Sequence, residues 1–240
     1  MAKKKTIIFI KIGYLILISV VLLNMGLKTL PSNIYGDGDE YAQMTVSFYN
    51  HNTPDLQTKD SLLVRQDFKN FHGEKLKNQV YFKSKNGKWY SFHFWGYSAL
   101  TTPIYALLKY LNINPERSFM VLNILAYILT SWVLMFYLYK GKDLTGVIYS
   151  VVLLFSGISW YLRWSQPEVL SFCLFYMAVL LMFKKKHYVS SILIALASLQ
   201  NPPIALFLPL LFFFIWFNEK GIPYKKLITV TLLGSIALLP

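Results

Sequence analysis

The chain has 240 residues, of which 55% are hydrophobic, 17% are aromatic and only 15% are charged, with a formal net charge of +13. This balance lies outside that of soluble globular domains and predicts a membrane protein. The positive charge does not indicate a nucleic-acid partner, because it falls in short clusters between apolar segments, which is the pattern of loops that face the cytoplasm.

The first apolar segment runs from Ile7 to Met25 and follows three lysines at positions 3–5. About 20 apolar residues cross a bilayer as a helix, so this segment is long enough to do so. No small-x-small cleavage site follows it, and residues 1–25 are therefore expected to form a retained signal anchor. The amino terminus is then expected in the cytoplasm, and residues 26–117 form an extracytoplasmic loop.

The stretch GDGDEYAQM at positions 36–44 gathers three of the eleven acidic residues just after the first span. Its two glycines indicate a turn, and Asp39 is expected to cap a helix that begins there. Tyr41, Met44 and Phe48 follow at helical spacing, which predicts a short amphipathic helix along the membrane surface. The outer loop is thus expected to carry juxtamembrane helices.

Two further features of this loop indicate local structure. The stretch KNGK at positions 85–88 predicts a hairpin turn. Residues 94–108 are uncharged and resemble a span, but counting them as one would invert the orientation of every later loop. We therefore expect a re-entrant or interfacial helix on the outer face.

Lysine clusters separate the remaining apolar segments and read YKGKD, FKKKH and NEKGIPYKK. If these clusters and the amino terminus all face the cytoplasm, the later segments alternate across the membrane without conflict. The expected spans are Ser118 to Tyr139, Leu144 to Leu162, Glu168 to Phe183, Tyr188 to Gln200, Pro203 to Phe217, and Leu227 onward. The sequence predicts an all-α polytopic membrane protein built as a transmembrane helical bundle.

Ionisable residues gather on the expected outer face. They are Asp37, Asp39 and Glu40 of the acidic turn, His93, and Arg163 and Glu168 of the stretch YLRWSQPEVL. Ionisable groups at span ends are candidates for function by default. A structural alternative remains for each set, since acids favour the first turn of a helix and an interfacial Arg and Glu can extend to the surface and pair.

Three parts of the sequence together carry a family resemblance. A DE pair with an amphipathic helix follows the first span, then comes KWYSFHFWGYSALTTPIYALLKYLNINPERSFMVLN, then an Arg before a Pro-acid pair at the next outer loop. This order resembles the GT-C membrane glycosyltransferases, nearest to the protein O-mannosyltransferases and the lipid A aminoarabinose transferases. The resemblance implies a GT-C-like helical bundle. It also implies that residues 1–240 are the amino-terminal part of one catalytic domain, with residues 118–240 supplying further spans.

The resemblance also implies roles for particular residues. Asp39 corresponds to the catalytic base of the family, with Glu40 beside it, and this pair of acids could hold a divalent cation. Arg163 corresponds to a family Arg, and a cation at this level would meet the leaving phosphate. The residues expected to contact substrate are Asp37, His93, Arg117, Arg163 and Glu168.

The expected reaction moves a sugar from a polyprenyl-phosphate donor to a hydroxyl group of a lipid, glycan or protein acceptor, with inversion, at the outer face of a bacterial inner membrane. Two alternatives stay open, namely a transporter or flippase of lipid-linked sugars and a non-catalytic membrane scaffold. Transporters place ionisable groups near mid-span, whereas the acids here cluster at one surface. That position favours catalysis.

Overall fold

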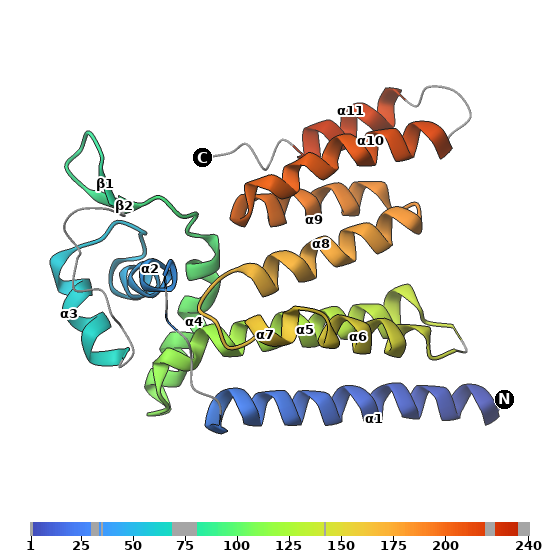
Figure 1. Ribbon diagram of the computed structural model, residues 1–240, viewed down its shortest axis with the longest axis horizontal. Coiled ribbons are helices and arrows are strands. Elements are labelled where there is room, and N and C mark those ends of the chain that lie inside the picture. The colour runs from blue at the N-terminus through green and yellow to red at the C-terminus, as the bar shows by residue number, and fades with distance from the viewer. Residues whose placement is uncertain are drawn as a thin grey trace. The chain divides into compact units, whose positions relative to one another are not determined.

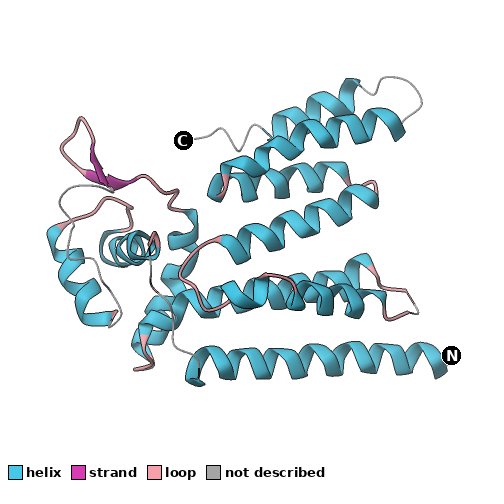
Figure 2. Cartoon of the chain, viewed as in Figure 1, coloured by secondary structure: helices cyan, strands magenta, loops and turns pink. Residues whose placement is uncertain are grey.

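The structure is a computed structural model that describes residues 2–29, 34, 36–68, 81–141, 143–218 and 224–234. The described residues are predominantly helical and include one short antiparallel hairpin (Figures 1 and 2). The predicted all-α class is therefore confirmed.

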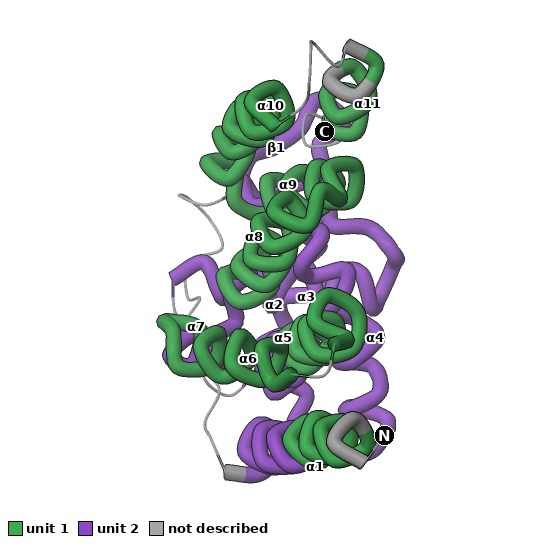
Figure 3. The backbone as a smooth tube through the Cα atoms, turned by 90° about the vertical axis from the view of Figure 1, so that its right-hand side faces the viewer, with its two compact units in different colours: residues 1–16, 126–158, 168–240 green, residues 17–125, 159–167 purple. Residues whose placement is uncertain are grey.

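The chain divides into two compact units (Figure 3). The bundle unit comprises Met1–Ile16, Ala126–Ile158 and Glu168–Pro240, and the loop unit comprises Leu17–Leu125 and Ser159–Pro167. Two long helices, α1 (Ala2–Asn24) and α5 (Ser118–Trp132), contribute residues to both units. Each unit is built by its own set of contacts.

The bundle unit is made of helices that alternate with short connections. They are η3 (Val133–Leu138), α6 (Thr145–Phe155), α8 (Glu168–Phe183), α9 (His187–Gln200), η4 (Pro202–Leu206), α10 (Phe207–Asn218) and α11 (Tyr224–Gly234). Helices α8 to α11 follow one another along the chain (Figure 1). They share an apolar core of Ala178, Ile194, Leu211, Ile215 and Val230. Hydroxyls support this packing, because Ser190 and Ser191 donate to the carbonyls of Ala178 and Val230 at 2.8 and 2.9 Å.

Within the described residues, two helical stretches are long and apolar enough to cross a membrane, Lys5–Lys28 and Pro115–Leu138. The expected span from Leu144 to Leu162 is not continuous, because α6 ends at Phe155 and a short helix, α7 (Ile158–Tyr161), follows. Ser156 explains the break, since its backbone is extended and its hydroxyl donates to the Leu153 carbonyl at 2.6 Å. Such local bonds compete with the helix.

A lysine lies buried within the bundle unit. Lys11 of α1 is 2% exposed, and its ammonium donates to the carbonyls of Met135 at 3.2 Å and Tyr139 at 2.6 Å. These carbonyls belong to the end of a helical stretch, where the backbone has no internal partners and a cation is favoured. The charge is therefore satisfied by backbone dipoles.

The loop unit contains the carboxy-terminal part of α1, the π-helical turn η1 (Met25–Thr29) and the amino-terminal part of α5. Between them lie α2 (Gly38–His51), α3 (Thr58–Asp67), β1 (Tyr81–Lys83), β2 (Trp89–Ser91), α4 (Gly96–Tyr110) and the 3₁₀ turn η2 (Pro115–Arg117). The helix predicted after the acidic turn, the hairpin predicted at positions 85–88 and a helix close to residues 94–108 are all present.

Helix α2 packs against α4 and α3. Its apolar stripe includes Tyr41 and Met44, which are buried, and the Tyr41 ring meets the edge of Tyr97 from α4 at 5.4 Å. We expected this stripe to lie on the membrane surface. Contacts inside the loop unit instead account for its periodicity.

A buried carboxylate joins α2 to α3. Asp60 is 1% exposed and accepts hydrogen bonds from Ser47 at 3.1 Å and Asn50 at 2.8 Å of α2. It also contacts Nε2 of His51 at 3.0 Å and accepts from the Gln57 backbone N–H at 2.8 Å. A buried charge is tolerated only with such partners, so these contacts fix α3 beside α2.

Candidate functional site

The acidic turn leads directly into α2. Gly36 has a φ of +57°, a left-handed conformation that glycine adopts without steric cost. The expectation that Asp39 caps the helix is wrong, because α2 begins at Gly38 and Asp37 occupies the capping position. Asp39 and Glu40 lie in the first turn, where the helix dipole stabilises negative charge.

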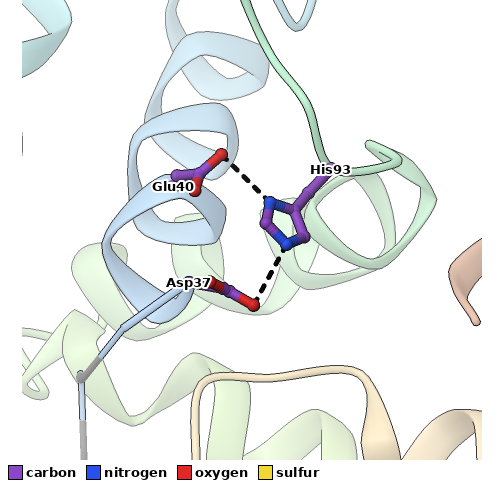
Figure 4. Close-up of side chains that lie close together, drawn as sticks. All are labelled: Asp37, Glu40 and His93. Atoms are coloured by element: carbon purple, nitrogen blue, oxygen red, sulfur yellow. Dashed lines mark hydrogen bonds and ion pairs between the residues drawn. The ribbon is translucent and has the colours of Figure 1, made fainter. Parts of the chain in front are cut away.

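Asp37 makes no capping bond through its side chain, because its carboxylate contacts His93 (Figure 4). Asp37 Oδ2 lies 3.0 Å from Nε2 of His93, and Glu40 Oε2 lies 3.1 Å from Nδ1 of the same ring. A carboxylate only accepts hydrogen bonds, so both ring nitrogens act as donors. The geometry is that of an imidazolium held between two carboxylates.

The electrostatics agree with this geometry. The hydrogen bond that His93 donates to Glu40 raises the pKa of His93 above its usual value, and the charges of Glu40 and Asp37 add to this effect, whereas burial opposes it. The two acids differ in exposure, because the Asp37 side chain is 56% exposed and that of Glu40 only 3%. Glu40 therefore contacts the His93 ring on its buried side, and Asp37 contacts the ring on its exposed side.

The hairpin supplies a further bond to this cluster. Ser91, at the end of β2, donates its hydroxyl to Glu40 Oε2 and accepts the backbone N–H of His93 at 2.9 Å. The hydroxyl thus fixes both the buried carboxylate and the backbone that carries the ring. Sequence reasoning missed this role of Ser91, because no local pattern distinguishes it from other strand serines.

The segment before α8, which contains Ser165 and Gln166, packs against the acidic turn. A Cβ atom added to Gly38 would overlap Ser165 Oγ, and one added to Gly36 would lie 3.8 Å from Gln166 Nε2. Gly38 therefore permits a close approach that a side chain at this position would obstruct, whereas Gly36 lies at ordinary contact distance from Gln166. This contact joins residues 36–38 and 165–166, which the sequence separates by most of the chain.

A buried amide holds the segment before α8 in place. Asn123 of α5 is fully buried, accepts from the Tyr97 hydroxyl at 2.9 Å and donates to the Trp164 carbonyl at 2.9 Å. Its amide also lies 3.3 and 3.4 Å from the carbonyls of Leu162 and Tyr161. Sequence reasoning missed Asn123, although an amide within an apolar span is a signal for an interhelical bond.

The other predicted site residues occupy different surroundings. The Arg163 guanidinium lies 5.7 Å above the ring centre of Trp160, a cation–π geometry. Arg117 donates to the carbonyls of Gly26 at 2.8 Å and Lys28 at 3.4 Å, at the end of the first long helix. Glu168 is the first residue of α8 and belongs to the bundle unit, whereas the acids, His93 and both arginines belong to the loop unit.

Asp37, Glu40 and His93 each offer a ligand atom, and these atoms lie within 4.8 Å of one another. Carboxylate and imidazole ligands suit zinc. The sequence suggested Asp39 and Glu40 as the pair that could hold a cation, whereas the structure groups Glu40 with Asp37 and His93. In the observed arrangement each nitrogen of His93 faces a different carboxylate, so the ring would have to turn before one cation could contact all three.

Asp39 is half-buried, and its Oδ1 atom is inaccessible to solvent. The negative charge of Asp39 affects Tyr81 in the hairpin. Burial raises the pKa of Tyr81, and the negative charges of Glu40 and Asp39 raise it further. The start of β1 therefore lies within electrostatic reach of both acids.

The fold and the site define a helical protein whose described residues include two helices long enough to cross a membrane and an acid–histidine cluster in the loop unit. Comparison with protein-family models, with curated proteins and with solved structures found no match.

Proposed function

We propose that the protein is a membrane glycosyltransferase that moves a sugar from a polyprenyl-phosphate donor to an acceptor hydroxyl at the outer face of the membrane. One observation carries the proposal. The acidic turn with His93 and the segment containing Ser165 and Gln166 pack together, although they come from two separate outer loops predicted from the sequence. A reaction at the membrane surface needs groups from several outer segments at one place.

The proposed topology has several crossings, with the lysine clusters in the cytoplasm. The two long apolar helices support membrane insertion, and the shorter apolar helices α8, α9 and η4–α10 are the further candidate crossings. Short spans are accommodated by local thinning of the bilayer. In this topology the acidic turn, the hairpin and helices α2 to α4 face outward.

In the proposed reaction Asp39 takes the proton of the acceptor hydroxyl as the oxygen attacks the anomeric carbon of the donor. The bond between that carbon and the phosphate oxygen breaks, and the polyprenyl phosphate leaves as an anion with inversion at the sugar. Arg163 stabilises the charge that develops on the leaving phosphate. Atoms and charge balance without a further reactant.

Glu40 and His93 act as positioning residues in this scheme. Three carboxylates within four positions repel one another. The imidazolium between Asp37 and Glu40 offsets this repulsion. It leaves Asp39 as the acid of the turn that neither nitrogen of His93 contacts.

The proposal is tested by measuring sugar transfer in membranes from cells that express the chain. Vesicles are supplied with radiolabelled polyprenyl-phosphate sugars, and the label in envelope lipids and glycans is separated and identified by mass spectrometry. We expect label in a new acceptor with wild-type membranes and almost none with Asp39→Asn. Movement of the intact sugar lipid across the vesicle without transfer would instead support a flippase, and neither activity would support a scaffold.

A further inference from the structure

The loop unit contains a cavity of about 390 Å³ between α3 and the hairpin. Thr58, Ser61, Leu62 and Arg65 line it from α3, and Tyr81 and Trp89 line it from the two strands. The four helical residues recur at i, i+3, i+4 and i+7, which places them on one face of α3. The volume lies within the range of small-molecule sites.

Hydrogen bonds and an ion pair hold the strand side of this cavity and the start of α3 in place. The Leu56 backbone N–H donates to the Trp89 carbonyl at 2.8 Å, and Lys88 pairs with the buried Asp55 at 3.3 Å. The Asp60 contacts described above fix the start of α3. A preformed site binds without the entropic cost of ordering its walls.

The lining has a definite chemical character. The rings of Tyr81 and Trp89 offer apolar faces, and the hydroxyls of Thr58 and Ser61 offer hydrogen bonds. Arg65 is exposed, and within the part of the chain that the structure describes no carboxylate pairs with it and no acidic residue lines the cavity. A ring with one apolar face, several hydroxyls and an anionic group matches this set.

Strand β2 connects the cavity to the acidic turn. Trp89 lines the cavity, and Ser91, two residues later on the same strand, donates to Glu40. Alternate residues of a strand point to the same face about 7 Å apart. The same strand therefore contributes one residue to the cavity and one to the acidic cluster.

We propose that this cavity binds the acceptor, and that the acceptor is a sugar ring that carries a carboxylate or a phosphate group. The acceptor role rests on the proposed function, whereas the binding of an anionic sugar does not. The ring stacks on Trp89, Arg65 contacts the anionic group, and a free hydroxyl is directed toward Asp39. The chemistry of the cavity thus selects an acidic glycan or a sugar phosphate over a neutral sugar.

Saturation-transfer NMR on the full chain in detergent measures this binding without any donor, so a failure of the proposed transfer leaves the result interpretable. The probes are glucuronic acid, glucose 6-phosphate, methyl glucoside and inorganic phosphate. We expect both anionic sugars to bind more tightly than methyl glucoside. Arg65→Gln should weaken the anionic sugars about tenfold, the loss expected for a charge-assisted hydrogen bond, and leave methyl glucoside unchanged.

Lys59→Gln is the matched control, because Lys59 is an exposed residue of α3 that does not line the cavity. It should change none of the affinities, and comparison of its thermal unfolding with that of Arg65→Gln excludes a folding defect. Trp89→Leu should weaken all three sugars but not inorganic phosphate. The proposal is overturned if no probe binds or if Arg65→Gln leaves the affinity for the anionic sugars unchanged. It is also overturned if inorganic phosphate binds as tightly as glucose 6-phosphate and Trp89→Leu changes the affinity of neither ligand.

Discussion

Nδ1 of His93 donates to Oε2 of Glu40 at 3.1 Å and thereby joins residues that lie 53 positions apart. The bond connects the segment after the hairpin to the first turn of α2. Its partner on the other side of the ring, Asp37, lies 3.0 Å from Nε2. The same ring therefore fixes both ends of the acidic turn.

This arrangement predicts that His93 titrates above its usual pKa of about 6.5. Glu40→Gln should lower the pKa of His93 more than Asp37→Asn, because the hydrogen bond to Glu40 is the largest contribution. A titration of ¹⁵N-histidine signals by NMR measures both, with His93→Gln identifying the resonance. Since the folded pKa is raised, the stabilisation is complete below about pH 6.5 and is lost as the pH rises through the folded value. Identical pKa values in all variants would contradict the ion pairs.

Asp39→Asn tests the proposed base. We expect sugar transfer to fall by about 10² to 10⁴, which is the usual contribution of general base catalysis. Stability should change little, because the loss of one charge in the first turn costs about 0.3–1 kcal/mol. Radiolabel transfer and thermal unfolding measure the two effects, and Asp37→Asn should reduce transfer less. Near-normal transfer by Asp39→Asn would exclude Asp39 as the base and make Glu40 the next residue to test.

Arg117→Gln should destabilise the loop unit without a specific loss of substrate binding. Its guanidinium satisfies the carbonyls of Gly26 and Lys28, and an orphaned polar group costs about 1–3 kcal/mol. Limited proteolysis and thermal unfolding report the change, and Arg117→Lys should restore part of the stability. A raised KM for the donor with unchanged stability would instead favour the substrate contact that the family resemblance implies.

Gly38→Ala should displace the segment around Ser165, because the added methyl group overlaps the Ser165 hydroxyl. Crowding of this kind typically costs about 1–3 kcal/mol. Removing the hydroxyl relieves the overlap, so Gly38→Ala should cost less in a Ser165→Ala background. A double-mutant cycle by thermal unfolding measures this coupling. Additive effects of the two changes would show that the segments do not touch in solution.

Cysteine labelling tests the proposed topology. Cys173 is the one native cysteine and is buried, so an impermeant thiol reagent will report mainly on introduced sites. Asn86→Cys and Asn201→Cys should react from outside intact cells, and Gly141→Cys should react only after permeabilisation. Labelling of Gly141→Cys from outside would reverse the orientation and make residues 94–108 a span.

Local patterns predicted the local elements of this chain. Helices α2 and α4 follow from helical spacing and apolar composition, and the hairpin follows from an Asn-Gly turn. The break at Ser156 was not predicted, because the whole segment is apolar and the competing bond comes from one hydroxyl.

The partners within the site depend on tertiary packing. The sequence identified the acidic turn and His93 as candidates, but not that His93 contacts Asp37 and Glu40 rather than Asp39. Neighbouring residues on a helix point in different directions, so the register of α2 decides which acid meets the ring. The register in turn follows from helix packing that no short window of sequence contains.

The partners of Lys11 are synthesised much later than Lys11 itself. Its ammonium is satisfied by the carbonyls of Met135 and Tyr139, which leave the ribosome long after α1. In the proposed topology α1 crosses the membrane, where a charge without partners is costly, so Lys11 is expected to stay hydrated near the membrane surface until those carbonyls arrive. A nascent chain that stops before position 135 offers neither of the two carbonyls that hold Lys11.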